Sequence, residues 1–170
     1  QMDVLTPQGV ETLVATDGTW LSAESGRRTF GAWLPHQMGG EIVDARTTPS
    51  DLMPKTLDAL AWKSVVVAEI PAHQATPQMC ELNKKIRSFH PVSVKQDEDG
   101  WYIYDMGTNF VGFTEVKMPA VADGEQVELH YDDYFLTDSV GFREGLYTDY
   151  YIGNGKANGS FSSKFNYKGY

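Results

Sequence analysis

The side chains best suited to metal binding are scattered along the sequence. The four histidines, His36, His73, His90 and His130, have no second ligand two or four residues away that would suit zinc. A structural zinc site is therefore not expected. A glycine-rich segment, 153–156, lacks the first glycine of a P-loop and is not followed by a helix pattern, so we interpret it as a hairpin turn rather than a phosphate site.

Carboxylate side chains are the remaining candidates for metal binding and for acid–base catalysis. Residues 97–99 and the pair Asp132-Asp133 carry oxygen ligands that calcium accepts, but neither has the spaced loop of an EF-hand. We interpret residues 97–99 as a solvated turn and Asp132-Asp133 as a polar strand end. No cofactor is therefore expected, and bound calcium is the alternative. Glu125 and Glu128 would face opposite sides of a strand, and they would not converge as a catalytic pair. No catalytic residue is predicted in this chain.

Aromatic residues are the outlier in the composition. They form 12% of the chain, and 11 of the 21 Phe, Trp and Tyr residues lie within 131–170. Exposed rings stack on the C–H faces of sugars, which favours carbohydrate binding. Cores and cross-strand pairs of β-sandwiches also use aromatic residues heavily, so a packing role stays open.

Length and charge narrow the class of protein. The chain has 170 residues, about one domain, and its 14 basic and 23 acidic residues give a net charge of −9. This charge repels phosphate backbones and anionic lipids, which excludes nucleic acid and membrane surfaces as partners. No apolar run approaches the roughly 18 residues of a spanning helix. The single cysteine, Cys80, excludes an internal disulfide and is interpreted as a small apolar filler.

The elements that would position these residues are short strands. Alternating patterns separated by Gly-, Asp- and Asn-rich turns predict an all-β fold, an antiparallel β-sandwich with little helix. Only residues 49–62 have a helical pattern, long enough for a turn or two. The predicted strands are 10–16, 41–46, 64–70, 86–90, 92–94, 101–104, 110–118, 125–131, 146–152 and 160–167.

The blocks YDMGTNFVGF at 104–113 and GEIVDAR at 40–46, with further blocks in order, resemble the bacterial α-L-rhamnosidase family of glycoside hydrolases. Residues 104–113 (YDMGTNFVGF) resemble the Asp-x-Gly-x-Asn-x-x-Gly signature that opens the family's concanavalin-like domain. Residues 40–46 (GEIVDAR) resemble a Gly-Glu-x-x-Asp-Ala-Arg block of its N-terminal module. Further similar blocks are 124–131, 148–152 and 165–170, together with Trp20 and Trp62-Lys63.

The resemblance implies that residues 1–170 form one β-sandwich fragment of jelly-roll or concanavalin-like type. It places an internal boundary near 91–99, between the end of the N-terminal module and the concanavalin-like domain. It also implies that the catalytic (α/α)-barrel, with its acid and base carboxylates, lies elsewhere in a longer bacterial polypeptide that hydrolyses terminal α-L-rhamnosides by inversion. Its partners would be the rest of that glycosidase and rhamnose-containing glycans. The compartment is open, with a periplasmic or exported location favoured over a cytoplasmic one.

The signature block contains the candidate binding residues. Asp105 and Asn109 suit hydrogen bonds to backbone N–H groups around a bend at Gly107, which is the favoured structural role. In the alternative, Asp105 and Asn109 form hydrogen bonds with sugar hydroxyl groups beside Trp101 and Tyr104. The expected function is therefore a noncatalytic segment that supports the catalytic barrel and contacts carbohydrate. The alternative is a stand-alone, lectin-like carbohydrate-binding module.

Overall fold

The structure, a computed structural model, describes residues 2–31, 39–47, 61–69, 79–82, 84–131, 148–166 and 168–169. Within these ranges it contains strands and no helix, which confirms the all-β prediction. None of the described residues forms a helix of the length and apolarity that crossing a membrane requires. The strands are β1 (Met2–Thr6), β2 (Gly9–Val14), β3 (Leu21–Ser22), β4 (Arg27–Phe30), β5 (Gly40–Asp44), β6 (Lys63–Ser64), β7 (Ser93–Gln96), β8 (Tyr102–Asp105), β9 (Val111–Gly112), β10 (Glu115–Lys117), β11 (Gln126–His130), β12 (Thr148–Ile152), β13 (Ser160–Ser162) and β14 (Lys168–Gly169).

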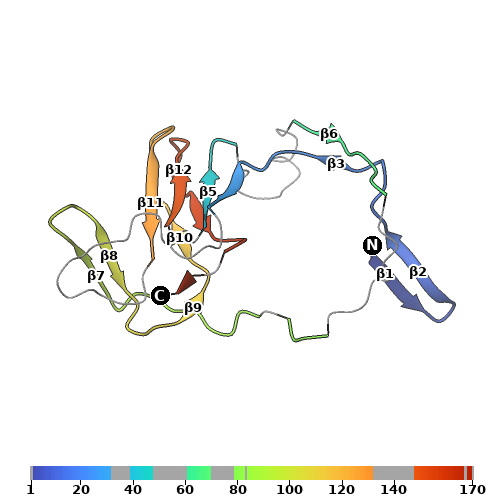
Figure 1. Cartoon of the computed structure of the whole chain (residues 1–170), viewed down its shortest axis with the longest axis horizontal. Coiled ribbons are helices and arrows are strands. Elements are labelled where there is room, and N and C mark those ends of the chain that lie inside the picture. Colours follow the sequence, from blue (N-terminus) through green and yellow to red (C-terminus); the bar gives the residue numbers. More distant parts are fainter. Residues whose placement is uncertain are drawn as a thin grey trace.

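The largest sheet joins strands that are far apart in the sequence. Its order is β11-β12-β5-β4, and β12 pairs antiparallel with β11. The β5–β12 pair is parallel, with Val43 opposite Tyr151, and it brings together residues more than 100 positions apart. Among the described pairs only this one departs from the expected antiparallel arrangement. Figure 1 shows β11, β12 and β5 side by side, between the β7–β8 hairpin and β3.

A small core lies against one face of this sheet. Side chains alternate along a strand, so one face, which we call the inner face, carries Arg27, Glu41, Val43, Asp149 and Tyr151. Val43 and Tyr151 pack with the buried residues Met118, Val121 and Phe161. Since Phe161 belongs to β13, which pairs with β10, these two strands form the second layer of the sandwich.

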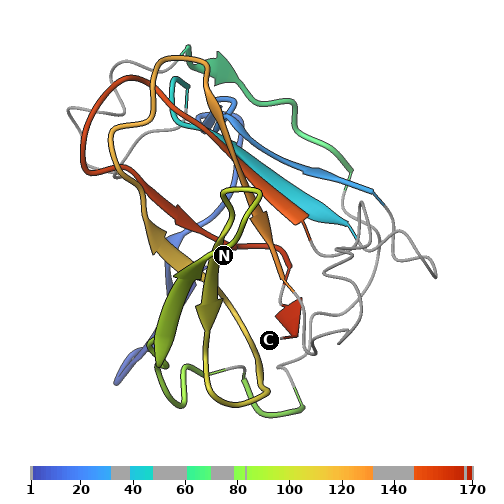
Figure 2. The ribbon, with the colours of Figure 1, turned by 90° about the vertical axis from the view of Figure 1, so that its left-hand side faces the viewer.

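The opposite, outer face meets a separate hairpin. It carries Arg28, Ile42 and Asp44, and its strand β11 ends at His130. The hairpin of β7 and β8 approaches this strand through Trp101, whose ring meets the His130 ring edge-on with 4.7 Å between centroids. Figure 2 shows the hairpin from the front.

A second hairpin stands apart from the sandwich. Strands β1 and β2 pair with each other, and Figure 1 shows them at the far end from the four-stranded sheet. Their apolar side chains are exposed, with Leu5 81% and Val10 71% accessible. A two-stranded hairpin is marginally stable in water by itself, so this pair needs a further surface to pack against.

Three sequence interpretations need correction. The apolar run 64–70 is not a buried strand, because only Lys63–Ser64 pairs, with β3, and Val66 is 91% exposed. Residues 86–90 lack strand structure, and Cys80 is exposed rather than an apolar filler. The helical pattern at 49–62 falls outside the described residues except for Ala61 and Trp62, as do His36, His73 and Asp132-Asp133.

Candidate functional site

The predicted sugar-binding residues divide between two faces of β8. Alternation places Tyr104 on the same face as Tyr102, and the two rings are 58% and 62% exposed. Asp105 lies on the other face and is partly buried. Trp101 precedes the strand and contacts His130 instead. Tyr102 was not selected from the sequence, although its i, i+2 spacing from Tyr104 was a usable signal.

Asp105 has a structural contact of the kind expected for the signature. Its Oδ1 accepts a hydrogen bond from the backbone N–H of Gly107 at 2.8 Å. Gly107 has φ +73°, a left-handed conformation that favours glycine, and a Cβ there would lie 3.0 Å from a Val92 methyl group. The bend after β8 therefore explains why an aspartate stands at 105 and a glycine at 107. Asn109 lies exposed just beyond this bend. A role of Asp105, Asn109, Trp101 and Tyr104 in carbohydrate binding stays a prediction.

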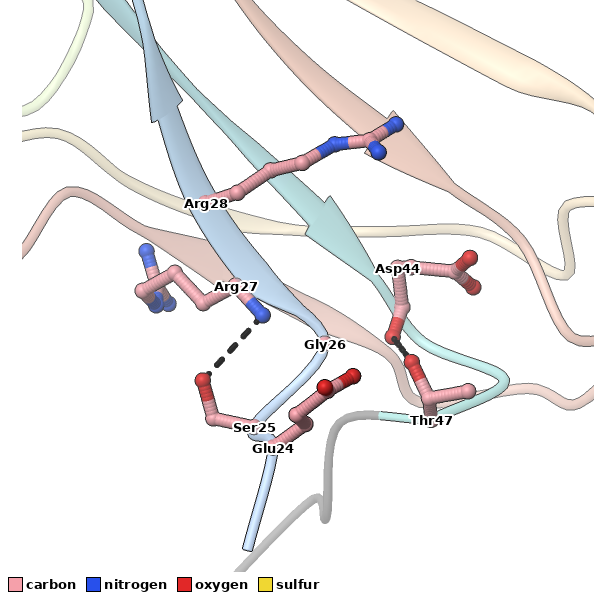
Figure 3. Close-up of a pocket in the computed structure, with 7 residues that line it drawn as sticks. All are labelled: Glu24, Ser25, Gly26, Arg27, Arg28, Asp44 and Thr47. Atoms are coloured by element: carbon pink, nitrogen blue, oxygen red, sulfur yellow. Dashed lines mark hydrogen bonds between the residues drawn. The ribbon is translucent and has the colours of Figure 1, made fainter.

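An open polar hollow lies where β4 begins and β5 ends (Figure 3). It has a volume of about 390 Å³ and is lined by residues 24–28, Asp44 and Thr47. Arg28 and Asp44 reach it from the outer face of the sheet, because Arg28 pairs with Ile42 and Asp44 follows two residues later. The sequence signal for this site was weak, since its lining residues come from two segments.

The buried carboxylate of Glu41 accepts hydrogen bonds from several donors. Its side chain is fully buried, and it accepts hydrogen bonds from Nη1 of Arg27 at 2.5 Å and from three successive backbone N–H groups. These donors belong to Lys164, Phe165 and Asn166, at 2.8, 2.7 and 3.0 Å. Glu41 thus fastens the chain after β13 to the inner face of the sheet.

A second buried carboxylate continues this network. Oδ1 of Asp149 accepts the backbone N–H of Glu41 at 2.7 Å and lies 3.4 Å from Nζ of Lys168. Its Oδ2 accepts a hydrogen bond from the Ser163 hydroxyl at 3.3 Å. Lys168 is also buried and donates to the carbonyl of Gly39 at 3.1 Å. The charges of two acidic and two basic side chains therefore balance inside the sandwich. We call these four side chains, Arg27, Glu41, Asp149 and Lys168, the buried charge network.

The electrostatics around Glu41 favour the ionised form of its carboxyl group. Burial by itself would raise the pKa of Glu41, but the N–H groups of Phe165, Lys164 and Asn166, together with Arg27, outweigh it and hold that pKa below its ordinary value of 4.5. A general acid or base must lie within hydrogen-bond reach of a substrate, and the Glu41 side chain is fully buried. The network is therefore structural, and within the described residues no group of three acidic, His or Cys side chains could hold a metal ion.

The fold and these sites define a class of protein: a two-layer β-sandwich whose buried polar groups serve structure. Comparison with known protein families supports this class. The family model of the bacterial alpha-L-rhamnosidase concanavalin-like domain matches residues 95–170, and that of the alpha-L-rhamnosidase N-terminal domain matches residues 1–87. The chain belongs to the bacterial α-L-rhamnosidase family, as the sequence blocks predicted.

Curated relatives and a solved structure extend this result. The chain is 24% identical over 176 residues to an alpha-L-rhamnosidase of Alteromonas sp. (strain LOR), covering 100% of this chain and 18% of that protein. It is 25% identical over 165 residues to an alpha-L-rhamnosidase of Formosa agariphila, covering 91% of this chain and 17% of the relative. The structure of an alpha-L-rhamnosidase from Dictyoglumus thermophilum has the same fold over 99% of this chain and 19% of its own, with a TM-score of 0.66 at 23% identity. The chain thus spans less than a fifth of each of these proteins.

Proposed function

We propose that this chain is a noncatalytic β-sandwich segment of an α-L-rhamnosidase, a glycoside hydrolase, and that it supports the enzyme's catalytic barrel. The observation that carries the proposal is the buried charge network. It uses Glu41 and Asp149, the two fully buried carboxylates of the described residues, to hold the sandwich together and leaves them closed to a substrate.

Exposed apolar surface supports the second part of the proposal. Leu5, Val10 and Leu13 of the β1–β2 hairpin and the residues Val66 and Val67 are exposed by half or more. Apolar surface of this kind on a folded protein commonly marks a contact with another protein surface. The remaining four-fifths of an enzyme as long as the curated relatives would supply such a surface.

Hydrolysis of 4-nitrophenyl α-L-rhamnopyranoside tests the noncatalytic part. We expect the purified 170-residue chain to release no nitrophenol above the rate without protein, while the alpha-L-rhamnosidase of Formosa agariphila serves as the active control. Release that rises in proportion to the concentration of the chain, and survives repeated purification, would overturn the proposal.

Deletion in a longer relative tests the supporting role. Removing the aligned segment from the Alteromonas alpha-L-rhamnosidase should lower its Tm and soluble yield, whereas the pH profile of the enzyme that stays folded should not change. An unchanged Tm would show that the segment gives no support. A changed pH profile would show that it contributes to the chemistry.

A lectin-like module is the second candidate, and the exposed pair Tyr102 and Tyr104 favours it. In this alternative the two exposed rings on this face of β8 bind rhamnose-containing glycans. Calorimetric titration of the chain with L-rhamnose, with and without calcium, distinguishes the candidates. Heat that saturates and disappears in Tyr104→Ala would favour the module, and its absence at millimolar sugar would remove it.

A further inference from the structure

Two asparagines between β12 and β13 are each followed by glycine, in Asn154-Gly155 and Asn158-Gly159. The segment that holds them, residues 153–159, leads from the four-stranded sheet to the second layer, so it is a crossover and not the hairpin turn expected for 153–156. Glycine has no Cβ to screen its backbone nitrogen, so the side-chain amide of a preceding asparagine can meet that nitrogen closely. The two pairs therefore offer the same chemistry in two different surroundings.

The amide of Asn154 is held at both of its polar atoms. Its Nδ2 donates a hydrogen bond to the carbonyl of Ala45 at 2.9 Å, and its Oδ1 accepts the backbone N–H of Lys156 at 3.1 Å. The residue is also partly buried. Turning its Cγ toward the nitrogen of Gly155 would break both hydrogen bonds, so the structure protects this asparagine.

The amide of Asn158 is not held in this way. The residue is exposed, and among the residues that the structure describes its side chain has no hydrogen-bond partner. Its φ is +65°, the only positive φ of a non-glycine residue in the described ranges, and asparagine adopts this left-handed conformation more readily than most residues. The Asn158 amide can therefore rotate in water beside the nitrogen of Gly159.

We propose that Asn158 is a site of spontaneous deamidation, with water as the co-reactant. The backbone nitrogen of Gly159 bonds to Cγ of Asn158, the Cγ–Nδ2 bond breaks, and the Gly159 amide proton leaves with Nδ2 as ammonia. The product of this step is a succinimide ring. Water then opens the ring at either carbonyl: cleavage at Cγ gives aspartate, and cleavage at the main-chain carbonyl gives isoaspartate. No atom is oxidised or reduced.

Isoaspartate at this position would disturb the second layer of the sandwich. The carbonyl of Gly159 accepts the N–H of Met118 at 2.8 Å, and β13, with the fully buried Phe161, begins at the next residue. Gly159 also packs tightly, since a Cβ there would overlap the Tyr151 hydroxyl. Isoaspartate adds Cβ to the main chain, and Gly159 cannot keep both contacts after that insertion. Deamidation thus weakens the packing of β13 against the core as the protein ages.

Incubation of the purified 170-residue chain in H₂¹⁸O at mildly alkaline pH, followed by peptide mass spectrometry, tests the site. We expect deamidation at Asn158 to run at least about tenfold faster than at Asn154, because two hydrogen bonds of ordinary strength restrain the latter. The product at Asn158 should carry ¹⁸O and include isoaspartate, which direct hydrolysis of the amide cannot give. In urea the two rates should converge, since both asparagines precede glycine and the fold no longer distinguishes them.

Asn158→Gly is the matched control, because glycine tolerates the positive φ and has no side-chain amide. The Tm of the wild type should fall as isoaspartate accumulates, whereas the Tm of Asn158→Gly should stay constant through the same incubation. A wild-type Tm that stays constant while isoaspartate accumulates would contradict the effect on β13.

Three results would overturn the proposal itself. The first is an intact Asn158 in the folded chain after a period in which the urea-unfolded chain has converted. The second is equal rates of deamidation at Asn154 and Asn158 in the folded chain. The third is a product that contains aspartate and no isoaspartate. Failure here leaves the proposed function intact, because the nitrophenol and deletion experiments do not depend on this residue.

Discussion

Replacing Glu41 with glutamine removes the charge at the centre of the buried network with almost no change of shape. The carboxylate accepts hydrogen bonds from four donors: the guanidinium of Arg27 and the N–H groups of Lys164, Phe165 and Asn166. An amide has one oxygen and one NH₂ group in the same place. If its oxygen keeps the backbone N–H groups, its NH₂ faces Arg27, and the opposite orientation sets the NH₂ against the backbone donors.

The cost follows from the unpaired charge that remains. Arg27 is largely buried, and breaking a buried ion pair by removing one partner typically costs about 3–5 kcal/mol. This is a large share of the roughly 5–15 kcal/mol by which domains are stable. For a chain of this length it corresponds to a fall in Tm of about 6–20 °C. Glu115→Gln, at an exposed position on β10, is the matched control and should stay within about 0.5 kcal/mol of the wild type.

The same carboxylate predicts a loss of stability in acid. The pKa of Glu41 is lower in the folded chain than its ordinary value of 4.5, so its contribution is complete above pH 4.5 and is lost as the pH falls through the lower, folded value. Urea unfolding followed by tryptophan fluorescence at pH 7 and at pH 4 measures this directly. Glu41→Gln should be less stable at pH 7 and should also show a smaller fall in stability between the two pH values.

A double-mutant cycle with Arg27→Met then isolates the pair. The coupling between the two substitutions should exceed about 1 kcal/mol, because the residues share one hydrogen bond and one charge interaction. A Glu41→Gln chain within 1 kcal/mol of the wild type at pH 7 would refute the reasoning, and so would a coupling near zero.

Three further predictions concern particular residues. Gly153→Ala should destabilise the chain by roughly 3 kcal/mol, because its Cβ would lie 2.5 Å from the carbonyl oxygens of Val121 and Ala122. The control Gly18→Ala should be tolerated, because the nearest atom to its Cβ is 3.6 Å away. Equal midpoints of thermal unfolding for the two variants would contradict this prediction. Asp105→Ala should cost about 1 kcal/mol by urea unfolding, since the Gly107 N–H loses its acceptor. A stability equal to that of the wild type would contradict this structural role. Burial raises the pKa of Tyr151 above its ordinary value of 10.0, so the stability of the chain should fall as the pH rises past 10. Tyr151→Phe should reduce that fall. Identical profiles of stability against alkaline pH for the variant and the wild type would show that burial of this hydroxyl has no consequence.

Local patterns predicted much of the fold because turn chemistry acts over a few residues. Asp97 accepts the N–H groups of Asp99 and Trp101, and Gly100 takes φ +90°, so the β7–β8 hairpin was predictable from its polar turn. The apolar run 64–70 was misinterpreted because hydrophobicity does not show whether a partner strand is present. Strand β4 was missed because two arginines at its start hid the alternation, although one of them is paired on the inner face.

The buried charge network depends on contacts that a single sequence cannot reveal. Glu41 and Asp149 are 108 residues apart, and their hydrogen bond exists only because β5 lies parallel to β12. Strands β5 and β12 lie in one sheet through this pairing, which could not be predicted from either segment alone. The polar hollow likewise needs the register of β4 with β5 before Arg28 and Asp44 come together.

Native-state hydrogen exchange tests most directly whether the buried charge network unites the sandwich. If it does, the amides of β5, of β12 and of residues 164–166 open with one common free energy in the wild type. Glu41→Gln should then lower that free energy equally in all three segments. Exchange that speeds up at residues 164–166 alone, with β5 and β12 unchanged, would contradict this account.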